Sequence, residues 1–92
     1  MNNEIILQEL ENITNKLGVT IRYEDGDFIG GMCRINDEKF VIVNKRLLVN
    51  NKIKIIAKEV SNLNIEEIFI LPAIKEIILE NRKLNTSDIK RV

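Results

Sequence analysis

The spacing of apolar residues changes along this chain from a helical period to a strand period and back, which divides it into elements. Near the N-terminus the spacing alternates between four and three residues, which predicts a helix from about residue 4 to residue 17. Asn3 can cap the start of this helix, and Gly18 lies where a left-handed residue commonly ends one. The apolar stripe of the helix consists of Ile6, Leu10, Ile13 and Leu17.

Apolar and polar residues then alternate, which predicts a half-buried strand over 19–24, followed by a loop over 25–31 that contains Asp and Gly residues. Two further runs, 32–36 and 39–44, flank Asp37-Glu38 and predict a β-hairpin with its tip at these two residues. The second run is apolar on both faces, which is typical of a strand that is covered on both sides or exposed at an interface. Its apolar side chains are Phe40 and Ile42 on one face and Val41 and Val43 on the other.

Helical spacing returns in the second half of the chain. A second helix is predicted from Asn50 or Asn51, either of which can cap it, to about residue 63. Pro72 suits the first position of a third helix, which runs to about residue 81. The apolar residues of these two helices are Ile53, Ile56, Val60 and Leu63 in the second, and Leu71, Ile74 and Ile78 in the third.

This order of elements, α-β-β-β-α-α, predicts an α+β fold with a small, mostly antiparallel three-stranded sheet and its helices on one face. Residues 1–92 are expected to form a single domain, in which the polar residues 82–92 form a loosely held tail. A chain of 92 residues buries only about 60–68% of its unfolded surface. Dimerisation would therefore help it to bury more.

The composition excludes several classes of chemistry. The chain has no histidine and one cysteine, so it lacks the commonest catalytic base and cannot form an intrachain disulfide or a Cys-rich zinc site. Fourteen basic and fourteen acidic residues give no net charge that would attract a nucleic acid or an acidic membrane. No signal peptide and no apolar run long enough to span a bilayer is present. We expect a cytoplasmic protein without a cofactor.

Two stretches resemble a known family. They are Phe40-Val-Ile-Val-Asn-Lys-Arg-Leu and Ile55-Ile-Ala-Lys-Glu-Val-Ser-Asn-Leu63, and they resemble the hairpin and helix of the ImmA/IrrE-type metallopeptidases, small zincins that regulate repressors. In that family the helix carries Ala-His-Glu-Leu-Gly-His-Leu. The chain also resembles short bacterial proteins without an assigned activity.

The resemblance implies a site on the second helix, but the residues depart from the family at both zinc ligands. Lys58 and Asn62 occupy the two histidine positions, and only Glu59, the base of the family motif, is retained. An ammonium group at position 58 would lie where Zn²⁺ must bind, and an amide is a poor replacement ligand. The resemblance therefore implies a metal-free pseudo-peptidase scaffold. A chance match between common helix–hairpin–helix arrangements is the alternative.

Three other features have a structural and a functional interpretation. Cys33 could be a nucleophile, but without a histidine partner it is better explained as a buried strand residue. Gly30-Gly31 lacks the rest of a phosphate-binding motif and is expected to form a bulge or turn. Asp25 and Asp27 are too few for a calcium loop, and we expect a solvated loop there.

A basic run connects the hairpin to the second helix. If several of its side chains converge, they could bind a phosphate backbone or an acidic protein, whereas a solvated helix face is the structural alternative. Its members are Lys45, Arg46, Lys52, Lys54 and Lys58.

The functional hypothesis is a non-enzymatic interaction module without catalytic or metal-binding residues. Its expected partner is a second copy of the chain or another protein, rather than a membrane or a nucleic acid. Two alternatives stay open. One is a zincin-like hydrolase remnant with Glu59 as base, and the other is weak nucleic-acid binding through the basic run at 45–58.

Overall fold

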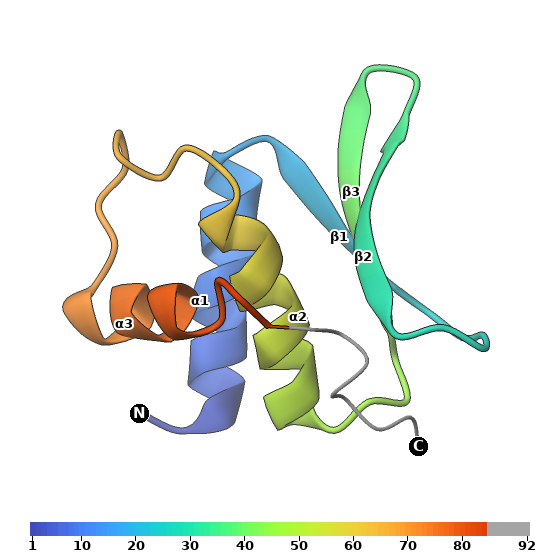
Figure 1. Ribbon diagram of the computed structural model, residues 1–92, viewed down its shortest axis with the longest axis horizontal. Helices are drawn as coiled ribbons and strands as arrows, with labels where there is room; N and C mark the ends of the chain where they lie inside the picture. The colour runs from blue at the N-terminus through green and yellow to red at the C-terminus, as the bar shows by residue number, and fades with distance from the viewer. Residues whose placement is uncertain (85–92) are drawn as a thin grey trace.

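The computed structural model describes residues 1–84 and contains three helices and one three-stranded sheet (Figure 1). This confirms the predicted α+β class. The prediction of a loosely held tail falls mostly on residues 85–92, which lie outside the described part of the chain. The elements in chain order are α1 (Asn3–Lys16), β1 (Val19–Glu24), β2 (Gly30–Ile35), β3 (Glu38–Asn44), α2 (Val49–Ser61) and α3 (Pro72–Glu80).

The helix ends differ from the predicted ones in their caps. Asn2, and not Asn3, caps α1, because its side chain accepts a hydrogen bond from the backbone N–H of Ile5 at 2.9 Å. Helix α2 begins after Leu48 without a side-chain cap, so neither Asn50 nor Asn51 has the predicted role. The predicted end of α1 is confirmed by Gly18, whose φ of 76° is in the left-handed region.

The predicted mostly antiparallel sheet is wrong, because the sheet is mixed with the strand order β1-β3-β2. The central strand β3 pairs antiparallel with β2 and parallel with β1. A parallel pair needs a crossover of about a dozen residues, and here residues 25–37, including β2 itself, provide it. The strand order in the sheet therefore differs from the order along the chain.

The hairpin between β2 and β3 turns one residue earlier than predicted. Ile35 pairs with Glu38, so the tip is Asn36-Asp37 instead of Asp37-Glu38. Asn36 has a φ of 56°, a conformation that asparagine tolerates better than most residues. The two glycines 30 and 31, predicted to end a loop, are the first two residues of β2.

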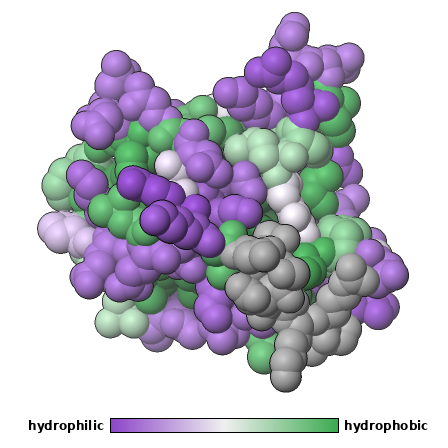
Figure 2. All heavy atoms as spheres, in the orientation of Figure 1, coloured by the Kyte–Doolittle hydropathy of each residue, from purple (hydrophilic) through white to green (hydrophobic). Residues whose placement is uncertain are grey.

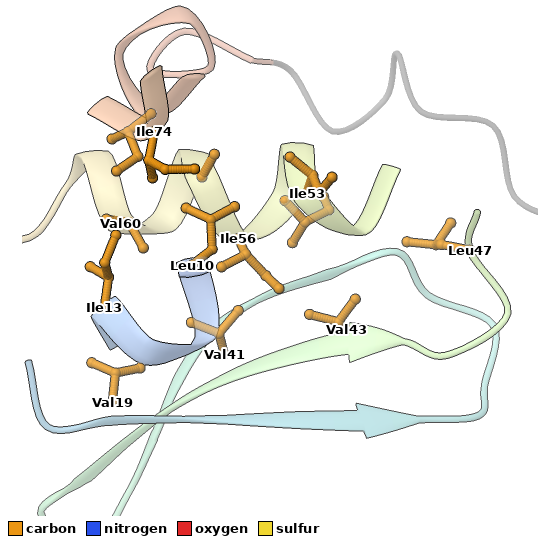
Figure 3. Close-up of a cluster of buried hydrophobic side chains, with 13 residues drawn as sticks. Leu10, Ile13, Val19, Val41, Val43, Leu47, Ile53, Ile56, Val60 and Ile74 are labelled. Carbon is orange, nitrogen blue, oxygen red and sulfur yellow. The ribbon is translucent and has the colours of Figure 1, made fainter. Parts of the chain in front are cut away.

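Helices α1 and α2 cover one face of the sheet, and α3 packs on these helices on the side away from it (Figures 1 and 3). In Figure 3, Val41 and Val43 of β3 point towards Leu10 of α1 and Ile56 of α2. All four side chains are fully buried. Burial of this apolar surface is the main stabilising contribution to the fold. Within residues 1–84, no helix covers the opposite face of the sheet.

Helix α3 begins at Pro72, as predicted, because proline suits a first turn that needs no backbone N–H. Ile74 and Ile78 are its buried residues. Leu71, predicted to join this stripe, is exposed and precedes the helix. Within residues 1–84, no helix is long and apolar enough to cross a membrane.

Candidate functional site

The positions that correspond to the zincin motif lie near the C-terminal end of α2. Helix α2 packs against the sheet and α1 with Ile53, Ile56 and Val60 fully or nearly fully buried. Lys58 and Asn62 are four residues apart and thus lie on one side of the helix, whereas Glu59 is rotated by about 100° from Lys58. Lys58 and Glu59 are half-buried, and Asn62 is an exposed C-cap residue.

These residues do not fit a zinc ion. An ammonium group offers no lone pair to a metal, and the amide of Asn62 is a weak ligand compared with imidazole. In the described part of the chain, no three His, Cys, Asp or Glu side chains gather as a metal site would require. Of the three positions compared with the zincin motif, only position 59 has the residue of that motif.

The members of the basic run have different contacts. Lys45 and Arg46 follow β3 and both bind Asp25, with Nζ–Oδ2 and Nε–Oδ1 distances of 3.1 and 3.0 Å. The Lys45 ammonium, as a hydrogen-bond donor, is the main cause that lowers the pKa of Asp25. Lys52 instead lies over the ring of Tyr23, 5.4 Å from its centroid. Lys45 and Arg46 are thus paired with an acidic residue and Lys52 with an aromatic ring, and Lys54 is exposed on α2.

Tyr23 connects β1 to both α1 and α2. Its hydroxyl donates a hydrogen bond to the Glu11 carboxylate, and its ring faces the Lys52 ammonium. Burial is the main cause that raises the pKa of Tyr23, and the hydrogen bond to Glu11 and the charge of Glu11 raise it further. The phenol thus stays protonated and links one edge of the sheet to its helices.

Asn44 is a key residue that the sequence analysis did not single out. It is 3% exposed, and its Nδ2 donates to the carbonyl oxygens of Gly26 and Phe28 at 3.0 and 2.7 Å. Its Oδ1 accepts from the backbone N–H of Arg46 at 3.0 Å. Asn44 therefore fixes the loop before β2 to the segment after β3. The sequence signal was that Asn44 is the polar residue directly after the apolar run Phe40–Val43.

A depression of about 530 Å³ lies where this loop meets β2. Gly30 is required there, because its φ is 151° and a Cβ would lie 2.5 Å from the carbonyl oxygen of Ile42. The depression is lined by backbone of β2 and by apolar side chains, and Asp27 is its acidic residue. The lining residues are Asp27, Phe28, Ile29, Gly30, Gly31, Met32 and Ile42.

The face of the sheet that is turned away from the helices is partly apolar. Phe40 and Ile42 of β3 are half-buried there, and Arg22 of β1 lies 5.8 Å from the centre of the Phe40 ring. Cys33 and Ile35 of β2 share this face, with Cys33 half-buried and Ile35 47% exposed. Figure 2 shows apolar residues between hydrophilic ones on the side of the molecule that carries β2 and β3.

Comparison of the chain with protein-family models, with curated proteins and with solved structures finds no match. The resemblance to the ImmA/IrrE-type peptidases thus stays a prediction from the residues.

Proposed function

We propose that this protein is a cytoplasmic, non-enzymatic interaction module that acts as a homodimer or through a larger protein partner. The observation that carries this proposal is the uncovered face of the sheet. Phe40, Ile42 and Ile35 are apolar, and within residues 1–84 no helix packs over them. A strand with apolar side chains on both faces is normally covered on both, so a second molecule is a natural cover.

The chemistry of α2 supports a role other than catalysis. A zincin-like reaction needs Glu59 to act on a metal-bound water, and the neighbouring Lys58 and Asn62 are unsuited to hold the metal. The basic run supports nucleic-acid binding less well, since Lys45 and Arg46 are already paired with Asp25. The apolar side chains of the uncovered sheet face therefore favour protein–protein contact.

Light scattering across a micromolar concentration series tests the proposal. We expect a mass near twice the 10.7 kDa of the chain. Phe40→Ser should weaken the dimer, because it removes apolar surface from the uncovered face without opening the main core. Leu48→Ser is the matched control, since Leu48 is 61% exposed and lies outside the sheet. A monomer at all concentrations, combined with no specific partner in cells, would contradict the proposal.

A further inference from the structure

The backbone of β2 has a row of hydrogen-bonding groups that point away from the sheet. The backbone N–H of Asn44 donates to the Ile29 carbonyl at 3.0 Å, so these two residues form a hydrogen-bonded pair. Along an antiparallel ladder, every second pair of opposite residues is a hydrogen-bonded pair. The N–H and C=O groups of Gly31, Cys33 and Ile35 therefore point towards β3. Those of Gly30, Met32 and Arg34 therefore point to the open edge.

This edge is available for pairing. Strand β2 is at the end of the sheet, and no other strand within residues 1–84 pairs with its outer side. Natural edge strands are usually protected by proline, by bulges or by several charged side chains, and β2 has only Arg34. The other edge strand, β1, has α1 packed along it and carries Arg22 and Glu24.

We propose that β2 pairs antiparallel with β2 of a second copy, with Met32 opposite Met32 across a two-fold axis, to form a continuous six-stranded sheet. This inference rests on the proposed homodimer and places its contact at the open edge of β2 instead of on the uncovered face, two surfaces that Met32→Pro and Phe40→Ser distinguish. A two-fold axis places the same strand on both sides, so each exposed donor of one copy meets an acceptor of the other.

The register follows from the directions of the backbone groups. With Met32 at the axis, Gly30 of one copy faces Arg34 of the other, so all three outward residues are paired and form hydrogen-bonded pairs. A register with Arg34 opposite Arg34 would place like charges together and leave Gly30 unpaired. Only the Met32-centred register uses the whole open edge.

The side chains also complement each other in this register. Gly30 has no side chain, so no side chain of one copy stands directly opposite Arg34 of the other. A second copy therefore matches the edge in hydrogen bonding, and this register places no two like charges opposite each other.

Cysteine cross-linking tests the register, since Cys33 is the only cysteine in the chain. In a Cys33→Ser background, Met32→Cys places two thiols opposite each other, with Cα atoms about 5.5 Å apart as in a hydrogen-bonded pair, which permits a disulfide. Ile35→Cys in the same background is the matched control, because its two copies are offset by about 20 Å along the strands. We expect at least about tenfold more covalent dimer from Met32→Cys under mild oxidation than from the control.

A proline variant tests the edge independently of cross-linking. The N–H of Met32 points outwards, so Met32→Pro removes no hydrogen bond between β2 and β3. We expect it to remain folded by circular dichroism and to lower the mass from near twice 10.7 kDa to 10.7 kDa. In the wild-type protein, the Met32 amide should exchange with solvent more slowly at high than at low protein concentration.

The outcomes separate this inference from the proposed function. A dimer that lacks the Met32→Cys cross-link and survives Met32→Pro would overturn the β2 edge as interface but leave the homodimer intact. A wild-type monomer would remove both the homodimer and its interface. Concentration-independent protection of the Met32 amide in a monomer would show that another segment covers the edge, which also overturns the inference.

Discussion

The side chain of Asn44 donates a hydrogen bond of 2.7 Å to the carbonyl oxygen of Phe28, sixteen positions earlier in the chain. This bond connects the end of the central strand to the loop that leads into β2. It therefore positions the glycines of β2, the adjoining depression and the open edge. A buried amide with three partners holds the region from which both proposals start.

Asn44→Ala should destabilise the protein by about 3 kcal/mol, because it removes three hydrogen bonds of a buried side chain, each worth about 1 kcal/mol. Urea unfolding measures the change. Asn62→Ala is the control, since Asn62 is exposed, and it should change stability by less than about 0.5 kcal/mol. Equal effects of the two variants would contradict the role of Asn44.

Gly30→Ala should destabilise the fold by more than about 2 kcal/mol, because the new Cβ would lie 2.5 Å from the Ile42 carbonyl oxygen. Gly31→Ala is a matched control. The two glycines have similar φ values, 151° and 158°, but a Cβ on Gly31 would meet no atom within 4 Å. We expect a smaller loss of stability for Gly31→Ala, so the difference between the two variants gives the contribution of the contact with Ile42. Thermal unfolding of both variants measures this difference.

The carboxyl group of Asp25 should titrate below its ordinary pKa of 3.8, because Lys45 and Arg46 stabilise its charged form. A lowered pKa means that the stabilisation is present above the ordinary value and is lost as the pH falls through the folded-state pKa. NMR titration measures this midpoint. Lys45→Gln should move it up towards 3.8, as should high salt, since the pair is exposed. An unchanged midpoint would refute the pairing.

The raised pKa of Tyr23 predicts a loss of stability in alkaline solution. A raised pKa gives stabilisation that is complete below the ordinary value of 10.0 and is lost as the pH rises above it. Tyr23→Phe should remove this loss between pH 10 and pH 11, at the cost of the hydrogen bond to Glu11. Glu11→Gln should lower the midpoint of the phenol in an absorbance titration. If Glu11→Gln left the midpoint in place, burial alone would explain the shift.

Purified protein should contain well below one zinc ion per chain after dialysis, because Lys58 and Asn62 replace both ligands of the zincin helix. Elemental analysis gives the result directly. Stoichiometric zinc would favour the hydrolase alternative and require ligands other than those two residues.

The sequence predicted the helices well because their signal is local. The stripe from Ile6 to Leu17 and the stripe around Ile56 each repeat with the helical period over several turns. Caps were predicted less well. Asn2 and Asn3 are both good caps, and only the backbone geometry that brings Asn2 Oδ1 to the Ile5 N–H distinguishes them.

The candidate site could be predicted only in part. The sequence placed Lys58, Glu59 and Asn62 on one helix, and the structure has Lys58 and Glu59 on α2 and Asn62 as its C-cap. It could not show that Lys45 and Arg46 contact Asp25, about twenty residues earlier, because charge patterns do not specify distant partners. The role of Asn44 was missed for the same reason, since its carbonyl partners belong to another segment.

The sequence by itself determined the α+β class and the two apolar faces of β3, because both follow from periodicity within a few residues. Only the tertiary structure decided that β1 pairs parallel with β3 and that β2 becomes an edge. Strand pairing joins residues far apart in the chain through backbone groups that are the same in every residue. The side-chain pattern therefore specifies which face of a strand is buried, but the packing of the whole chain selects its neighbours.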